Sequence, residues 1–305
     1  MKSAMIEVNE FSKTYGSFRA VDGISFAVQK GEIFGLLGPN GAGKTTTLEC
    51  LEGLRMADGG TLRVAGVDPG RDTNRLRSVI GVQLQSSGLP ETITPLEAMR
   101  FFCTYHKVAP RYDLLERLGL GQKEKARFAE LSTGQQRRLA LALAVAHEPE
   151  VLFLDEPTAG LDVASRAELH AILNEQQARG TTILLATHDM AEAEELADRI
   201  AILLHGRIAA TGTPMEITAT GASLTKVSVR TQQNLFNGHA DHMPGVQQFD
   251  RIDDYGIFFS TDIEATIGAI LSAIQTEDDT LIDLRVERPS LEDRFLEITT
   301  NGGQQ

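Results

Sequence analysis

A glycine-rich stretch near the amino terminus has the residue types and spacing of a phosphate-binding loop. Residues Gly38 to Thr45 fit the pattern G-x-x-x-x-G-K-[ST] without a mismatch. In such a loop backbone N–H groups approach phosphate oxygens, Lys44 reaches the β- and γ-phosphates, and Thr45 ligates Mg²⁺. The pattern predicts nucleotide binding through these residues: Gly38, Pro39, Asn40, Gly41, Ala42, Gly43, Lys44, Thr45 and Thr46.

The segments on either side of this loop have the patterns that position such a motif. The apolar run Glu32 to Leu37 predicts a buried strand, and Thr46 to Leu54 predicts a helix. A chance glycine turn with an incidental lysine would not need this order of strand, loop and helix. The flanking elements therefore favour the nucleotide site.

A second strand ends in two acids. The four apolar residues Val151 to Leu154 are followed directly by Asp155 and Glu156. Because buried carboxylates are costly unless they are paired or bind metal, the pair indicates a Mg²⁺ site at the strand end. We expect Asp155 to hold the ion and Glu156 to polarise the attacking water. The alternative is that both are exposed loop acids.

Two further side chains are placed to contact the nucleotide. The strand predicted over Thr182 to Thr187 ends at His188, which could hydrogen-bond the γ-phosphate. Tyr15, in the segment Lys13 to Ser17 between strands predicted at Ile6 to Val8 and Val21 to Val28, could stack on adenine. Taken alone, His188 would be incidental and Tyr15 a packed surface aromatic.

The stretch Leu131 to Gln136 precedes a predicted helix. Ser132 is a natural helix cap, and Gln135 three residues later completes a capping box. Taken without the rest of the chain, capping is the preferred interpretation of these residues.

Composition predicts a globular, cytoplasmic protein. The chain has 305 residues, of which 42% are apolar, and its longest apolar run, Leu139 to Ala146, is far shorter than the roughly 20 residues that span a bilayer. We expect no signal peptide in Met1 to Glu10, and we expect Cys50 and Cys103 to be core thiols. The net charge of −13 argues against nucleic acid as a partner.

The pattern along the chain predicts an α/β fold with two domains. A P-loop ATPase core with an antiparallel β subdomain is expected over residues 1–220, with a helical insert at about 86–147. Residues 221–305 are expected to form a small α+β accessory domain of unknown role. This region carries six basic and fourteen acidic residues, which supports a boundary near Gly221.

These motifs, together with the turn Thr158 to Asp162, resemble in order and spacing the ATP-binding subunit of ABC transporters over about residues 5–215. Thr133 stands where the family has a glycine in LSGGQ. The resemblance implies that ATP and Mg²⁺ bind, and that the chain pairs head to tail with a copy or a related subunit. Ser132, Gly134 and Gln135 would then contact the ATP held by the opposite loop.

The resemblance also assigns roles. Gln85 would sense Mg²⁺ and the lytic water, and Asp162 would organise the γ-phosphate and the dimer seam. The catalytic residues would be Lys44, Gln85, Glu156 and His188, and the metal ligands Thr45, Gln85 and Asp155. The helical insert would dock on a separate transmembrane permease, so that the chain works at the cytoplasmic face of the membrane without a membrane span of its own.

The ending Arg288 to Leu296 resembles exporter subunits of the daunorubicin-resistance type, as does Gln85 to Leu89. This implies export of a drug-like or lipid-like molecule, with the cargo and the choice between homodimer and heterodimer left open. Two alternatives are a soluble ABC ATPase acting on ribosomes or DNA and a small-molecule kinase. Neither a tandem repeat nor sustained heptads support the first, and the second leaves Leu131 to Gln135 unexplained.

Overall fold

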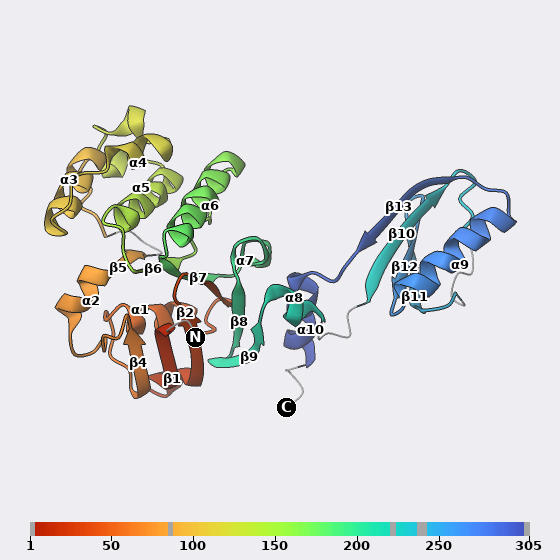
Figure 1. Ribbon diagram of the computed structural model, residues 1–305, viewed down its shortest axis with the longest axis horizontal. Helices are drawn as coiled ribbons and strands as arrows, with labels where there is room; N and C mark the ends of the chain where they lie inside the picture. Colours follow the sequence, from red (N-terminus) through yellow and green to blue (C-terminus); the bar gives the residue numbers. More distant parts are fainter. Residues whose placement is uncertain (1–3, 85–87, 220–223, 237–242, 302–305) are drawn as a thin grey trace. The chain divides into compact units, whose positions relative to one another are not determined.

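The computed structural model describes residues 4–84, 88–219, 224–236 and 243–301, and it divides into two compact units, Met1–Pro214 and Met215–Gln305 (Figure 1). The domain boundary that the sequence predicts, between residues 220 and 221, falls outside the described residues. Each unit has a hydrophobic core of its own, as folding domains do.

The central sheet of the first unit is largely parallel. Its described strands lie in the order β5-β6-β7-β3-β8-β9, and only the pair of β8 and β9 is antiparallel. Every position of β3, β6 and β7 is buried, as in strands that are covered on both faces. The bounds are β3 (Ile33–Leu37), β5 (Ile80–Gln83), β6 (Val151–Asp155), β7 (Thr182–Thr187), β8 (Arg199–Leu204) and β9 (Arg207–Gly212).

An antiparallel sheet shares a core with the central sheet and with helix α1 (Lys44–Leu51). Its described strands are β2 (Phe18–Gln29), β1 (Ala4–Tyr15) and β4 (Gly59–Val64), in that order. The strand predicted at Ile6 to Val8 is longer than expected, because β1 continues through Tyr15 in pairing with β2. Helix α2 (Thr73–Val79), which the sequence pattern did not predict, leads into β5.

The expected helical insert is present, and Figure 1 shows its helices grouped at one end of the unit. It contains α3 (Pro95–Tyr105), α4 (Tyr112–Arg117) and α5 (Thr133–Val145), which pack on one another. Thr94 and Glu97 form a capping box that fixes the start of α3. Helices α6 (Val163–Ala178) and α7 (Met190–Leu196) follow β6 and β7.

The second unit is a small α+β domain, as expected. Its described sheet is antiparallel, in the order β11-β12-β10-β13. Helix α9 (Ile263–Thr276) packs on β10, and Ile270 and Ile274 join Val229 and Phe258 in the core. The remaining bounds are α8 (Pro214–Ala219), β10 (Thr225–Thr231), β11 (Val246–Ile252), β12 (Tyr255–Ser260), β13 (Leu281–Glu287) and α10 (Leu291–Asn301).

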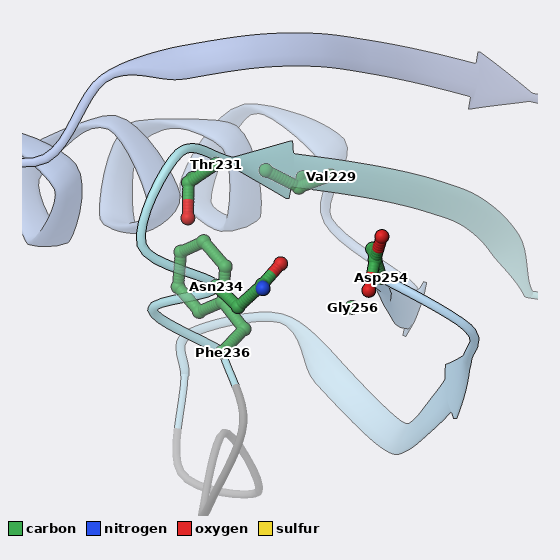
Figure 2. A pocket seen from close by; sticks show the side chains of 6 residues that line it. All are labelled: Val229, Thr231, Asn234, Phe236, Asp254 and Gly256. Atoms are coloured by element: carbon green, nitrogen blue, oxygen red, sulfur yellow. The ribbon is translucent and has the colours of Figure 1, made fainter.

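A small hollow lies beside the turn that follows β10 (Figure 2). Thr231 is almost fully buried at its edge, and its hydroxyl accepts the backbone N–H of Leu235 at 3.0 Å. The lining combines two apolar side chains with a hydroxyl, an amide and a carboxylate. The lining residues are Val229, Thr231, Asn234, Phe236, Asp254 and Gly256.

Candidate ATP-hydrolysis site

The parallel sheet brings the predicted motifs to one edge. Strand β3 runs into the phosphate loop, β6 into Asp155 and Glu156, and β7 into His188. Leu37 is paired with Thr187, and Asp155 with Ala186, so the three strands end at the same level. Residues distant in sequence therefore meet at the carboxyl edge, where ligands bind in open α/β sheets.

The phosphate loop is shaped by its glycines. Gly43 has φ +106°, and a Cβ there would lie 2.5 Å from the carbonyl oxygen of Ala20. A side chain at this position would strain the backbone and clash with β2. The Nζ of Lys44 lies within the loop and donates to the carbonyl oxygens of Gly38 at 2.6 Å and Pro39 at 3.3 Å.

Thr45 and Asp155 form the candidate magnesium site. The Thr45 hydroxyl donates to Oδ2 of Asp155 at 2.9 Å, whereas the buried Oδ1 has no hydrogen-bond partner among the residues that the structure describes. Burial raises the pKa of Asp155, and the bond from Thr45 opposes that shift. A hydroxyl beside a buried carboxylate oxygen without a partner is a donor set that fits Mg²⁺ completed by water and phosphate oxygens. Gln85, the third predicted ligand, lies outside the described residues.

Glu156 is held between the lysine and the histidine that the sequence singled out. Its Oε1 lies 3.8 Å from Nζ of Lys44, and its Oε2 lies 2.7 Å from Nδ1 of His188. Burial lowers the pKa of Lys44, and the charge of Glu156 opposes that shift. Glu156 has φ +51°, unusual for a residue with a side chain, and its backbone N–H donates to Ala186 at 2.8 Å. The turn thereby aims the carboxylate between Lys44 and His188.

Two residues that the sequence reasoning missed support this turn. Arg137, on α5, donates to the backbone carbonyl of Glu156 at 3.0 Å and also to that of Ala159. The hydroxyl of Thr187 donates to Oε2 of Glu156 at 3.5 Å. No local pattern marks Arg137, because it reaches the turn across 19 residues of chain; Thr187 could have been noticed as the neighbour of His188.

Four predicted ATP contacts lie in or beside helix caps of this chain. Ser132 accepts the backbone N–H of Gln135 at 3.3 Å, and Gln135 returns a bond to Ser132 N–H at 2.9 Å, as the capping interpretation required. Gly134 follows Ser132 in the first turn of α5. Asp162 caps α6 by accepting Ser165 N–H at 2.9 Å. Their predicted contacts with a nucleotide on a partner stay predictions.

Tyr15 lies at the end of β1 with 39% of its surface exposed. Lys13 Nζ and the guanidinium of Arg55 lie 5.6 and 5.5 Å from the centre of its ring. Cations over an aromatic face attract its π electrons, so these groups hold the ring in place while part of it stays open to solvent. This arrangement agrees with an adenine-stacking role without testing it.

Together, a parallel sheet with a phosphate loop, a buried carboxylate and a Glu–His pair at one edge define a nucleotide-hydrolysing P-loop cassette. The family model for "ABC transporter" matches residues 21–159. A daunorubicin resistance ATP-binding protein from Streptomyces coeruleorubidus is 35% identical, with 98% of this chain and 97% of that protein covered. A Nod factor export ATP-binding protein from Paraburkholderia xenovorans is 43% identical over 72% of this chain and 74% of its own.

Solved structures of similar proteins indicate the same class of protein. The ATP-binding subunit of an ABC transporter matches with a TM-score of 0.67 and 29% identity, covering 70% of this chain and 92% of that one. A dimeric bacterial ABC transporter cassette matches with a TM-score of 0.63 and 26% identity, covering 68% and 98%. The chain therefore belongs to the ABC transporter ATP-binding family and is an ABC ATPase, as predicted. The relatives favour this function over the ribosome or DNA alternative.

Proposed function

We propose that the chain hydrolyses ATP·Mg²⁺ to drive a separate transmembrane permease, with Glu156 as the catalytic base. The observation that carries the proposal is the convergence of Lys44, Asp155, Glu156 and His188 at one edge of the sheet. In this assignment Lys44 leaves its loop carbonyls to contact the β- and γ-phosphates. When bound between Thr45 and Asp155, Mg²⁺ neutralises charge on the phosphates.

Glu156 and His188 act as a pair in this proposal. Glu156 takes the proton of the attacking water, and His188, which contacts Oε2, keeps that carboxylate in position and reaches the γ-phosphate. Oε1 faces Lys44 at 3.8 Å, so both carboxylate oxygens of Glu156 lie beside a basic side chain.

A second cassette completes the proposed site. The Leu131 to Gln135 stretch carries a hydroxyl at the start of a helix, which is suited to an anion. In this chain the side chains of Ser132 and Gln135 bond each other's backbone N–H within the helix cap. We place Ser132, Gly134 and Gln135 against the γ-phosphate of the opposite chain, and Asp162 at the seam. The dimeric cassettes among the solved relatives support this arrangement.

The proposed permease contact is on the helical insert. Phe101 and Tyr105, four residues apart on α3, expose 64% and 59% of their surfaces. Large exposed apolar side chains on one helix face are typical of a protein contact. In the described part of the chain, no helix is long and apolar enough to cross a membrane. We therefore place the chain at the cytoplasmic face of the membrane through its permease, and we keep residues 221–305 as a proposed accessory domain.

We propose export of a drug-like or lipid-like molecule. The support comes from relatives whose names describe daunorubicin resistance, linearmycin resistance and Nod factor export. The permease, and not this chain, would bind and select the cargo.

The catalytic proposal is tested by Glu156→Gln, which keeps the shape of the side chain and removes the base. We expect ATP binding to be retained and hydrolysis to fall at least about 100-fold, since a general base contributes a factor of roughly 10² to 10⁴. Steady-state phosphate release and binding of a fluorescent ATP analogue measure the two effects. Glu194→Gln, an exposed acid on α7, is the control. Hydrolysis at the wild-type rate by Glu156→Gln would refute the proposed role.

A further inference from the structure

One side chain ties the start of α5 to the turn that carries Glu156. Arg137 lies on α5, five residues after the helix cap Ser132, and reaches the turn of residues 156–161, the Glu156 turn. Its Nη1 donates to the carbonyl oxygen of Glu156 at 3.0 Å and also to that of Ala159. Both hydrogen bonds that this guanidinium makes in the described part of the chain therefore go to the backbone of the Glu156 turn.

These two bonds hold the ends of residues 156–159 together. The carbonyl oxygen of Glu156 also accepts the backbone N–H of Ala159 at 3.3 Å, so Arg137 reinforces a closure that the backbone already makes. Glu156 has φ +51°, and a residue with a side chain keeps such a conformation only where surrounding contacts enforce it. A guanidinium that donates to carbonyl oxygens is a charge-assisted, and therefore strong, contact. Arg137 thus helps to fix the backbone from which the Glu156 carboxylate projects.

The first turn of α5 also packs on the Glu156 turn. Gly134 lies three residues before Arg137, so the two positions share one side of the helix. A Cβ at Gly134 would lie 3.5 Å from the carbonyl oxygen of Gly160 and 3.5 Å from Cδ2 of Leu161, which is ordinary contact distance. A shift of the helix start would therefore be felt by the turn, and Arg137 is the side chain that bonds the two.

We propose that Arg137 is a positioning residue for ATP hydrolysis, which couples the contact of Ser132 with the ATP of the opposite chain to the orientation of Glu156 in its own chain. The inference rests on the proposed function, in which Ser132 contacts that γ-phosphate and Glu156 is the base. When the opposite ATP fixes the helix start, Arg137 fixes the turn, and Glu156 stays between Lys44 and His188. The ATP bound by one chain thereby helps to align the base of the other.

The first test compares Arg137 with its neighbour on the helix. Arg137→Met keeps an unbranched stem and removes the donors. We expect it to lower kcat about tenfold, the size of one lost charge-assisted hydrogen bond, with KM for ATP and the Kd of a fluorescent ATP analogue unchanged. Arg137→Lys should return kcat to within about threefold of the wild type, because an ammonium group can still donate to both carbonyls. Arg138→Met is the matched control, since Arg138 donates to the carbonyl oxygen of Leu118 at 3.0 Å, within the insert.

The second test measures the coupling with a double-mutant cycle. Ser132→Ala removes the hydroxyl and, in the proposed function, lowers kcat about tenfold by itself. If Arg137 transmits part of this effect, Ser132→Ala costs less in a chain that already carries Arg137→Met. We therefore expect the double variant to lose about twentyfold in kcat, and not the roughly hundredfold that two independent losses would give.

Several outcomes would overturn the inference. A wild-type kcat in Arg137→Met would show that the Glu156 turn holds without the guanidinium, and an equal loss in Arg138→Met would show only a loosened insert. A loss of about a hundredfold in the double variant would overturn the coupling. If Arg137→Met does not fold, Arg137→Gln, whose shorter side chain is uncharged, replaces it in both tests with the same expectations. A wild-type kcat in Ser132→Ala or Glu156→Gln instead refutes the proposed function, and the coupling with it, and is measured in chains that keep Arg137.

Discussion

At the scale of single residues, a buried acid beside the phosphate loop affects the electrostatics of the site. Glu52, directly after α1, is 6% exposed, and in the described part of the chain its Oε2 has no hydrogen-bond partner. Burial, together with the charges of Asp155 and Glu49, raises the pKa of Glu52 to about 8. Glu52 is therefore protonated in the folded chain at neutral pH, so that fewer negative charges lie beside the nucleotide site.

This predicts a pH dependence of stability. Between pH 5 and 8 the unfolded chain has released the Glu52 proton and the folded chain still holds it, so stability falls by about 1.4 kcal/mol for each pH unit and levels off above pH 8. The substitution Glu52→Gln removes this pH-dependent contribution to the free energy of unfolding. We expect its stability relative to the wild type to rise between pH 5.5 and 8, measured by urea unfolding without nucleotide. Glu116→Gln, an exposed acid, should show no such rise; a constant difference for Glu52→Gln would contradict the prediction.

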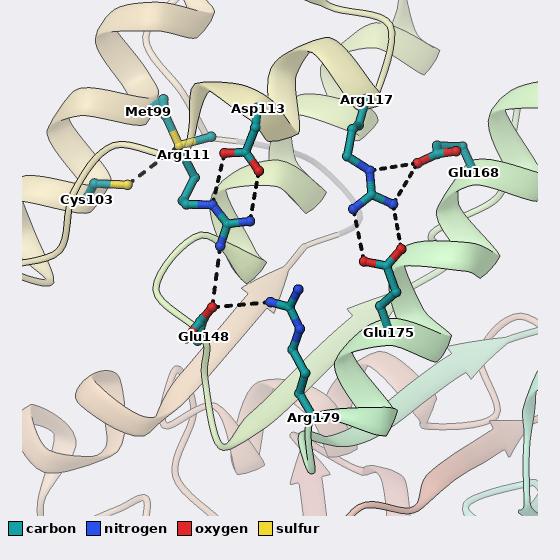
Figure 3. A network of polar contacts seen from close by, with 9 residues as sticks. All are labelled: Met99, Cys103, Arg111, Asp113, Arg117, Glu148, Glu168, Glu175 and Arg179. Atoms are coloured by element: carbon teal, nitrogen blue, oxygen red, sulfur yellow. Dashed lines mark hydrogen bonds and ion pairs between the residues drawn. The ribbon is translucent and has the colours of Figure 1, made fainter.

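At the scale of elements, polar contacts join the helical insert to α6 and to the residue that follows it (Figure 3). Arg117 on α4 donates to Glu168 at 3.0 Å and to Glu175 at 2.9 Å, both on α6. Arg111 and Arg179 share Glu148, at 3.4 and 3.2 Å. Helix α5 of the same insert carries Ser132 at its start and Arg137, which holds the Glu156 turn. The contacts between α4 and α6 therefore help to fix the orientation of the insert relative to the catalytic strands.

We expect Arg117→Met to lower the free energy of unfolding by about 1 kcal/mol. All three side chains are about one-third or more exposed, and ion pairs in such positions contribute little each. Urea unfolding in low salt measures the loss, which should shrink in 1 M NaCl because salt screens exposed charges. Arg100→Met, on the exposed side of α3, serves as the control. A loss of several kcal/mol that does not respond to salt would mean that packing of the arginine, and not its charge, joins the helices.

At the scale of the whole molecule, the acidic charge, the ATPase fold and the exposed aromatic pair on α3 describe one component of a larger assembly. The net charge of −13 disfavours nucleic acid as the partner, and the apolar side chains favour a protein. In the function that we propose, hydrolysis would act on the permease through closure and opening of paired cassettes, a population shift driven by the bound nucleotide.

The partner prediction is tested by tagging the chain and extracting it from native membranes in mild detergent. We expect a polytopic membrane protein in stoichiometric amount by mass spectrometry. Phe101→Ser should weaken this recovery while ATP hydrolysis by the purified chain is kept, because the residue lies on α3 and not at the sheet edge. Ile252→Ser, 57% exposed on β11 of the second unit, is the matched control. Recovery of ribosomal proteins or nucleic acid instead would contradict the permease proposal.

The sequence by itself determined the class of protein and singled out the candidate residues that the sheet brings to one edge. The phosphate loop, the acids after β6 and the histidine after β7 are short contiguous motifs, and apolar runs predict the buried strands that end in them. Family resemblance added the Ser132 stretch, whose local bonds alone indicate only a helix cap. The sequence could not fix the end of β1, because cross-strand pairing with β2 and not local pattern extends it through Tyr15.

The tertiary structure alone decided which atoms meet. The approach of Arg137 to the Glu156 turn, the bond from Thr187 to Glu156 and the burial of Glu52 and Glu192 all join segments that are distant in the chain or depend on what covers them. A residue pattern records polarity and spacing, but a pKa shift or an unpaired oxygen arises only when several elements exclude water from one point.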